Sequence, residues 1–251
     1  MKEFPWTFLN IPEKCLIEKR VYKKLFFENT KMTATDKKWF TKDVDSIHWM
    51  YALKPNSTLI HAVKEKHYTY DEIAVLEVEL DQDDHCNRLA DIIHRVIPYP
   101  LLIAFKGEDW VRLSVADKRF NLADNQAATL EELWVTNRFH EERLNEIERA
   151  FLKQMSYDKQ PRLNLKRFYR GWIDTFISYK TARITGEFMM PDSPEGKQKQ
   201  VEALQSYRKL EQQITDLRTK LKKQDAFNEK VKLNVEIKEL EKKLQKTEQK
   251  L

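Results

Sequence analysis

The sequence predicts an α+β protein, in which helices flank a mixed β-sheet body and a helical coiled-coil segment follows at the C-terminus. Two observations in the body and one in the tail predict this class. Up to residue 137, several short segments are apolar or alternate between apolar and polar residues with the two-residue period of β-strands. Between them lie segments whose apolar residues recur at helical spacing. From residue 197 onward there is no Pro, Gly or Trp, and apolar residues recur in steps of three and four.

The body is expected to contain a helix, two strands, a second helix and three further strands, in this order. Thr33 or Thr35 is suited to cap the first helix, because a hydroxyl oxygen accepts a hydrogen bond from the first turn. The clearest strand has one fully apolar face, whereas its other face ends in Glu77 and Glu79. The expected elements are the helix 35–44, the strands 46–53 and 72–80, the helix between Asp84 and Pro98, and the strands 101–105, 110–115 and 130–135.

These patterns divide the chain into four parts. Residues 1–137 form the α+β sheet domain, and 138–190 add basic, aromatic-rich helices that pack on it. Residues 191–196 lie in the one cluster of Pro, Gly and Ser and form a linker, and 197–251 form the coiled-coil tail. The two added helices are expected at 141–154 and 163–185.

The tail carries two apolar seams with a break in heptad register between Leu221 and Leu233. Since a helix turns about 100° per residue, one straight helix would not present both seams to one partner. Either the chain turns near 224–228 and two arms pack antiparallel, with Asp225 or Asn228 as a cap, or a single helix contacts two partners. The seam residues, which we expect to form an oligomer or partner interface, are Leu210, Ile214, Leu217, Leu221, Leu233, Ile237, Leu240 and Leu244.

Charge and glycine content exclude several classes of function. The chain has 45 Lys and Arg against 40 Asp and Glu, and the segment 196–251 holds 15 of the basic and 9 of the acidic residues. The tail is therefore basic, and the body is close to neutral. With only four glycines, the chain lacks the glycine-rich loops of dinucleotide-binding, P-loop and α/β-hydrolase sites.

Cysteine content and hydropathy indicate where the protein works. Two cysteines are too few for a disulfide framework, so a reducing compartment is expected. The start of the chain has no apolar core of signal-peptide length, and no run approaches the roughly 18 apolar residues of a membrane span. We therefore expect a cytoplasmic protein with no membrane partner. The six histidines lack metal-ligand spacing, so neither a metal nor another cofactor is expected.

The acidic end of strand 72–80 gives one alternative, an enzyme. Metal-dependent nucleases hold Mg²⁺ with carboxylates on adjacent strands, commonly beside a lysine. Glu77 and Glu79 share a strand face, and Asp45 or Lys118 would complete such a site. However, Glu79 stands where these enzymes usually have a lysine, two residues after the first carboxylate. An acidic strand end exposed to solvent is the ordinary alternative.

Basic and aromatic residues interleave between 159 and 186. Guanidinium and ammonium groups bind phosphates, and aromatic rings stack on unpaired bases, so this stretch is a candidate nucleic-acid contact. The same aromatic residues recur at helical steps and equally describe a buried stripe with a solvated basic face. The candidate contact residues are Arg162, Lys166, Arg167, Arg170 and Arg183.

Several segments, taken in order, resemble the bacterial family of domains of unknown function DUF4391 across nearly the whole chain. These segments are 17–22 with 26–28, 47–55, 73–80, 98–102, 181–188 and 227–234. The resemblance implies a setting, because such proteins are often encoded beside a helicase and an adenine-type DNA methyltransferase. These gene islands resemble restriction or phage-defence systems. The family offers no catalytic residues to carry over.

The resulting expectation is an accessory, non-catalytic subunit of a bacterial restriction or phage-defence type assembly. Its α+β body would dock on a larger helicase or methyltransferase subunit, its helical tail would supply association, and its basic residues would add contact with DNA. A divergent metal-dependent nuclease acting through Glu77 and Glu79 is the first alternative. A self-associating structural protein, forming a homo-oligomer through the coiled coil, is the second.

Overall fold

The computed structural model describes residues 4–29, 32–65, 68–120 and 128–251. The chain divides into two compact units, 1–176 and 177–251. The first unit holds the β-sheet, and the second holds two long helices.

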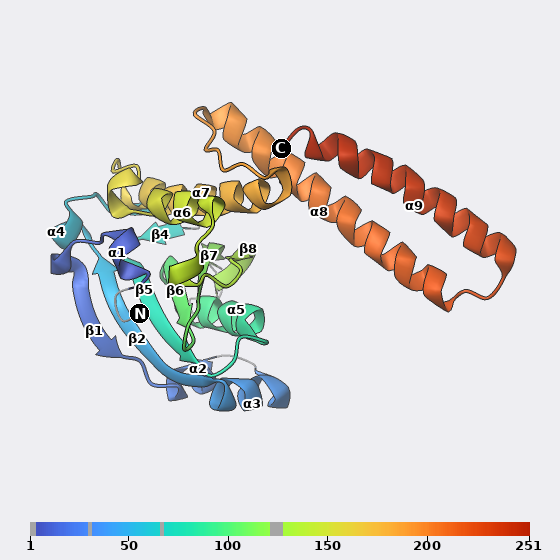
Figure 1. The fold of residues 1–251 in the computed structure, drawn as a ribbon. Helices are drawn as coiled ribbons and strands as arrows, with labels where there is room; N and C mark the ends of the chain where they lie inside the picture. The colour runs from blue at the N-terminus through green and yellow to red at the C-terminus, as the bar shows by residue number, and fades with distance from the viewer. Residues whose placement is uncertain (1–3, 30–31, 66–67, 121–127) are drawn as a thin grey trace. The chain divides into compact units, whose positions relative to one another are not determined.

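A six-stranded mixed sheet forms the centre of the first unit (Figure 1). Its strand order is β1–β2–β5–β6–β7–β8, and every pair of neighbours is antiparallel except β5 and β6. Helix α5 (Cys86–Val96) joins this parallel pair, because parallel neighbours need a crossover connection. The predicted α+β class with a mixed sheet is confirmed. The strands are β1 (Leu16–Arg20), β2 (Val44–Leu53), β5 (Ile73–Leu80), β6 (Leu101–Lys106), β7 (Val111–Phe120) and β8 (Ala128–Val135).

One face of the sheet packs against α5. The alternation along β5 causes this, since Ala74, Leu76 and Val78 all belong to the core that the apolar stripe of α5 completes. Helices α2 (Lys24–Asn29) and α3 (Ala34–Lys42) also contact α5. Of the two candidate caps of α3, Thr33 is used, because its hydroxyl accepts a hydrogen bond from the amide of Asp36 at 3.1 Å.

The opposite face carries α1 (Trp6–Leu9), α6 (Glu146–Gln154) and the first turns of α7 (Leu165–Thr185) (Figure 1). Tyr169 ties α7 to the sheet: its hydroxyl accepts a hydrogen bond from the amide of Ala116 at 3.1 Å and donates to the carbonyl of Leu101 at 2.8 Å. Phe168 and Trp172 are fully buried beside it. The aromatic residues of this stretch are therefore core residues, not a stacking surface for bases.

Helix α6 begins later than the predicted range 141–154. The side-chain oxygen of Asn145 accepts a hydrogen bond from the amide of Glu148 at 2.9 Å, and the Glu148 carboxylate accepts one from the amide of Asn145 at 3.1 Å. This reciprocal capping box starts the helix at Glu146. The residues before it, Glu141–Arg143, form a 3-10 turn.

Several short elements have no counterpart in the sequence patterns. They are the edge strand β1, the helices α1, α2 and α4 (Pro55–Thr58), and the two-stranded ribbon of β3 (Val63–Glu65) and β4 (Tyr68–Tyr70). All residues of β1 are exposed, so the strand has no buried face to produce an alternation.

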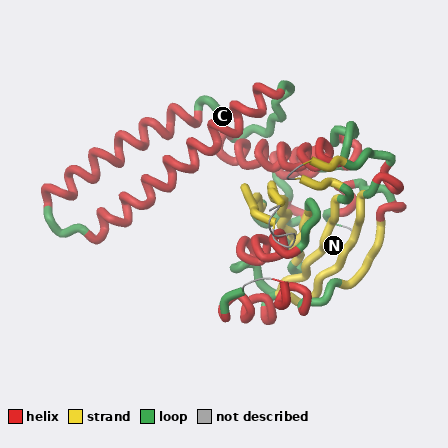
Figure 2. Tube along the Cα trace, turned by 180° about the vertical axis from the view of Figure 1, so that it is seen from behind, coloured by secondary structure: helices red, strands yellow, loops and turns green. Residues whose placement is uncertain are grey.

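The second unit comprises the end of α7 and two long helices, α8 (Pro194–Lys223) and α9 (Phe227–Glu248). The two helices lie side by side and antiparallel (Figure 2), with Ile214, Leu217 and Ile237 buried between them. The chain turns at 224–226, so it adopts the hairpin arrangement. Ala226 precedes α9 without a side-chain cap, so the expectation that Asp225 or Asn228 caps this helix is wrong. Within the described ranges, no helix is both long and apolar enough to cross a membrane.

Candidate functional site

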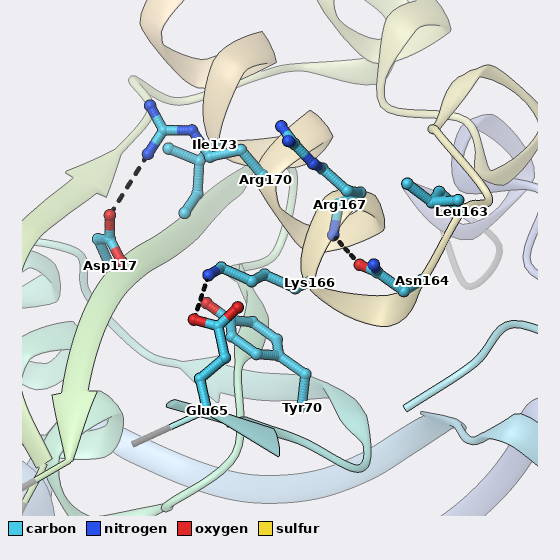
Figure 3. Close-up of a pocket in the computed structure, with 9 residues that line it drawn as sticks. All are labelled: Glu65, Tyr70, Asp117, Leu163, Asn164, Lys166, Arg167, Arg170 and Ile173. Carbon is cyan, nitrogen blue, oxygen red and sulfur yellow. Dashed lines mark hydrogen bonds and ion pairs between the residues drawn. The ribbon is translucent and has the colours of Figure 1, made fainter. Parts of the chain in front are cut away.

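A pocket of about 560 Å³ opens at the start of α7 (Figure 3). It is bounded by the first turns of α7, the β3–β4 ribbon and strand β7. Its lining combines three cations, two carboxylates, an amide and three largely apolar side chains. These residues are Lys166, Arg167, Arg170, Glu65, Asp117, Asn164, Tyr70, Leu163 and Ile173.

Asn164 determines how α7 begins at this pocket. Its side-chain oxygen accepts a hydrogen bond from the amide of Arg167 at 2.9 Å (Figure 3), so Asn164 serves as the N-cap. The amide of Leu165 donates to the carbonyl of His61 at 2.9 Å. With the aromatic side chains directed into the core, the basic side chains of the first two turns leave the helix on the pocket side.

Two of the three pocket cations are paired with carboxylates (Figure 3). The Lys166 ammonium lies 2.5 Å from a Glu65 oxygen. The Arg170 guanidinium lies 3.4 Å from Asp117 and 2.9 Å from Asp174. Burial raises the pKa of Asp117, and the charge of Arg170 opposes this shift. Arg167 is exposed, and in the part of the chain that the structure describes its guanidinium has no carboxylate partner.

The structure brings Lys166, Arg167 and Arg170 together in the pocket but not the other two predicted contact residues. Arg162 pairs with Asp158 and lies over the ring of Tyr157, 4.9 Å from its centroid. Arg183 is exposed and belongs to the second unit. Apart from Arg167, the members of this group in the first unit each meet a carboxylate. Among the predicted contact residues of the first unit, positive charge without a carboxylate partner in the described part of the chain is therefore found at Arg167.

The acidic end of β5 is bonded within the fold. The Glu77 carboxylate accepts a hydrogen bond from the ring N–H of Trp6 at 3.2 Å and pairs with the Lys106 ammonium at 3.0 Å. Glu79 accepts a hydrogen bond from the hydroxyl of Ser46 at 2.6 Å. Sequence reasoning missed Lys106; its position at the end of β6 was visible, but its pairing with β5 depends on the parallel register.

The two further residues suggested for a nuclease site do not complete it. Lys118 is buried, and its amino group donates to the carbonyls of Ile97 and Tyr99 just after α5, whereas Glu77 contacts α1 on the other face. The expectation that Lys118 supplies the lysine is therefore wrong. Asp45 is exposed at the start of β2. Among the described residues, no group of three His, Cys, Asp or Glu side chains is arranged to hold a metal ion.

Seven of the eight predicted interface residues of the tail pack against one another inside the hairpin. Leu210 is half-buried and lies outside the central cluster. The other arm of the same chain thus supplies the partner that an apolar seam requires. The cluster consists of Ile214, Leu217 and Ile237 at its centre, with Leu221, Leu233, Leu240 and Leu244 partly buried around them.

A second apolar stripe on α9 remains exposed. Phe227, Val231 and Val235 follow one another at four-residue steps, which place them on one side of the helix. They are 76%, 46% and 53% exposed, respectively. Sequence reasoning missed this stripe, although its spacing was a signal, because the seam from Leu233 accounts for most apolar residues of the same helix.

The fold and these sites define an α+β sheet protein with a C-terminal helical hairpin and a mixed-charge pocket beside the sheet. The model of the family described as domain of unknown function DUF4391 matches residues 9–244, and the chain belongs to this family. The family resemblance seen in the sequence is thereby confirmed. No curated protein and no solved structure matches the chain significantly.

Proposed function

We propose that the protein is a non-catalytic assembly subunit of the cytoplasm, whose C-terminal hairpin binds a partner protein. The observation that carries the proposal is the exposed stripe of Phe227, Val231 and Val235 on α9. The hairpin closes its own seam, so this stripe is apolar surface that internal packing does not use. Burying one such side chain fully contributes about 1.5–3 kcal/mol, so the stripe offers appreciable binding energy.

Basic residues are frequent near the stripe at the turn of the hairpin, although one of them, Lys232, is paired with Glu229 at 2.7 Å. Lys220, Lys222 and Lys223 lie in the last turn of α8, and Lys230 and Lys232 follow in the first turns of α9. An apolar stripe within a basic rim favours a partner that presents apolar residues within an acidic rim. The family resemblance suggests its identity, a helicase or DNA methyltransferase subunit of a restriction or phage-defence type assembly.

The test is multi-angle light scattering on the full-length protein, alone and after mixing with a helicase and a DNA methyltransferase, the two partners that the family resemblance suggests. The test variant is the triple substitution Phe227→Ser, Val231→Thr and Val235→Thr, which removes the apolar stripe and leaves the buried seam intact. We expect the wild-type protein to join one of the two enzymes and the variant to remain separate.

Met189→Ser is the matched control, because Met189 is also in the second unit and is 64% exposed, yet lies outside the hairpin. This variant should bind as the wild type does. A wild-type protein that joins neither enzyme rejects the proposal. So does a complex that the triple variant forms equally well.

A metal-dependent nuclease is the second candidate, and one observation favours it. Glu77 and Glu79 lie on one strand face, with Lys106 on the neighbouring parallel strand 3.0 Å from Glu77. If this site cleaves DNA, Glu77→Gln and Glu79→Gln will each abolish Mg²⁺- or Mn²⁺-dependent cleavage while the fold persists. A wild-type protein that is inert with both metals excludes this candidate.

Two further properties can be tested with the same protein and variant, namely self-association and contact with DNA. A stable homo-oligomer of the protein alone, lost in the triple variant, would favour a self-associating structural protein. DNA contact through the basic tail predicts binding that weakens steeply with salt, because each neutralised phosphate releases counterions. Affinity that is unchanged between low and moderate salt excludes such contact.

A further inference from the structure

The pocket at the start of α7 has the size and the mixed lining of a small-molecule site. Its volume of about 560 Å³ falls within the range of roughly 300–1,000 Å³ that is typical of such sites. We propose that this pocket binds a nucleoside phosphate of mononucleotide size. Arg167 holds the phosphate group, and Glu65 and Asp117 accept hydrogen bonds from hydroxyl or amino groups of the ligand.

The phosphate end of the site is set by Arg167. Its exposed guanidinium lacks a carboxylate partner within the described residues, so binding an anion breaks no existing ion pair. Arginine binds phosphate oxygens in a bidentate, charge-assisted manner. Lys166 lines the same pocket, where its ammonium is paired with Glu65 at 2.5 Å (Figure 3).

Side chains, and not free backbone amides, form this anion site. The amide of Arg167 already donates to the side chain of Asn164, and the amide of Phe168 donates to the carbonyl of the same residue. The positive end of the α7 dipole still adds a favourable field at this place. The recognition of phosphate therefore depends on residues that can be substituted singly without removing the cap of the helix.

The carboxylates determine what kind of anion binds. Glu65 and Asp117 line the same pocket (Figure 3), and they would repel a bare phosphate or sulfate ion. A ligand that carries hydrogen-bond donors beside its phosphate turns these two groups from repulsive to attractive. The ring of Tyr70 and the side chain of Ile173 supply an apolar wall for a planar group. Ribose hydroxyls and the amino groups of a base meet these requirements.

The local charge balance favours a small ligand over a nucleic-acid strand. Arg162, which precedes the site in the chain, is paired with Asp158, and Arg170, which lines the pocket, is paired with Asp117 and Asp174. A strand needs a series of unpaired cations to follow its phosphates, whereas this surface offers one concentrated point at Arg167. The inference concerns the first unit only and is independent of the hairpin function proposed above.

The test is isothermal titration calorimetry on the full-length protein with adenylate, guanylate, cytidylate and uridylate. The corresponding nucleosides, inorganic phosphate and a duplex DNA serve as comparison probes. The test variant is Arg167→Gln, and the control is Arg183→Gln, which removes an exposed arginine of the same helix outside the pocket. Circular dichroism and the midpoint of thermal unfolding verify that both variants are folded.

We expect at least one mononucleotide to bind more tightly than its nucleoside and more tightly than inorganic phosphate. Arg167→Gln should weaken this binding by about tenfold or more, since a charge-assisted contact to phosphate is lost, and Arg183→Gln should leave it unchanged. Three results overturn the inference: no mononucleotide binds at millimolar concentration, both variants weaken binding equally, or duplex DNA binds the pocket in preference to every mononucleotide.

Discussion

Lys118→Met should remove a pH-dependent component of stability from the first unit. Lys118 is 4% exposed, and its amino group donates to the carbonyls of Ile97 and Tyr99 at 2.9 and 2.7 Å. Burial lowers the pKa of this lysine well below its usual range. Between the folded-state pKa and the ordinary value near 10.5, the unfolded chain binds a proton that the folded chain does not.

The sign and the size of the effect follow from this difference in bound protons. The unfolded state binds more protons, so the free energy of unfolding rises with pH, by about 1.4 kcal/mol per pH unit for one proton. This slope applies between the lowered folded-state pKa of Lys118 and its ordinary value. A methionine side chain at this position would carry no proton in either state, so the stability difference between wild type and variant changes with pH at this slope. The buried His94, whose pKa is lowered by burial and by the charge of Lys118, is neutral in both states above its ordinary pKa of 6.5. It therefore does not contribute to the pH dependence above that value.

Urea unfolding followed by circular dichroism at several pH values measures this difference. We expect the free energy of unfolding of the wild type to rise relative to that of Lys118→Met as pH increases. Lys19→Met, which replaces an exposed lysine of β1, should follow the wild type at every pH. Parallel curves for wild type and Lys118→Met would refute the reasoning, because they would mean that Lys118 is protonated in the folded state.

Three further substitutions probe the packing of each unit. Tyr169→Phe removes the hydroxyl that contacts backbone groups of β6 and β7, so urea unfolding should show a loss of about 1–3 kcal/mol; Tyr22→Phe, at a side chain 73% exposed, should show none. Ile237→Ala should destabilise the hairpin by about 2 kcal/mol, and Val235→Ala by less than about 0.5 kcal/mol, as measured by hydrogen exchange of the α8 and α9 amides. Gly171→Ala places a methyl group against the side-chain oxygen of Gln160 and the ring of Pro161, so urea unfolding should show a free energy of unfolding lower by about 1–3 kcal/mol.

The fold class was predictable because periodicity acts over short distances. The alternation along 72–80 identifies a strand with one buried face, and β5 buries that face against α5. The break in heptad register after Leu221 identifies the turn of the hairpin, since two seams with different phases need two arms. The capping box of Asn145 and Glu148 was equally local, and using it would have placed the start of α6 correctly.

The candidate sites were less predictable, because residues distant in sequence decide what each side chain does. Lys166 and Arg170 read as free cations in the sequence, but Glu65 and Asp117 neutralise them in the fold. Arg167 has no carboxylate partner among the residues that the structure describes, although Lys166 and Arg170, which are also basic and lie close to it in the sequence, both have one. Only the i,i+4 pair of Arg170 with Asp174 was visible locally. Glu65 and Asp117 come from a ribbon and a strand far away in the chain.

The sequence by itself determined the alternation of the central strand, the helical spacing of the last two helices and the basic character of the tail. Each of these depends only on neighbouring residues and on the geometry of one helix or strand. Only the tertiary structure decided that Lys106 pairs with Glu77, that Lys118 is buried, and that the α7 cations surround a pocket. Such contacts depend on strand order and register, which bring together residues that no local pattern connects.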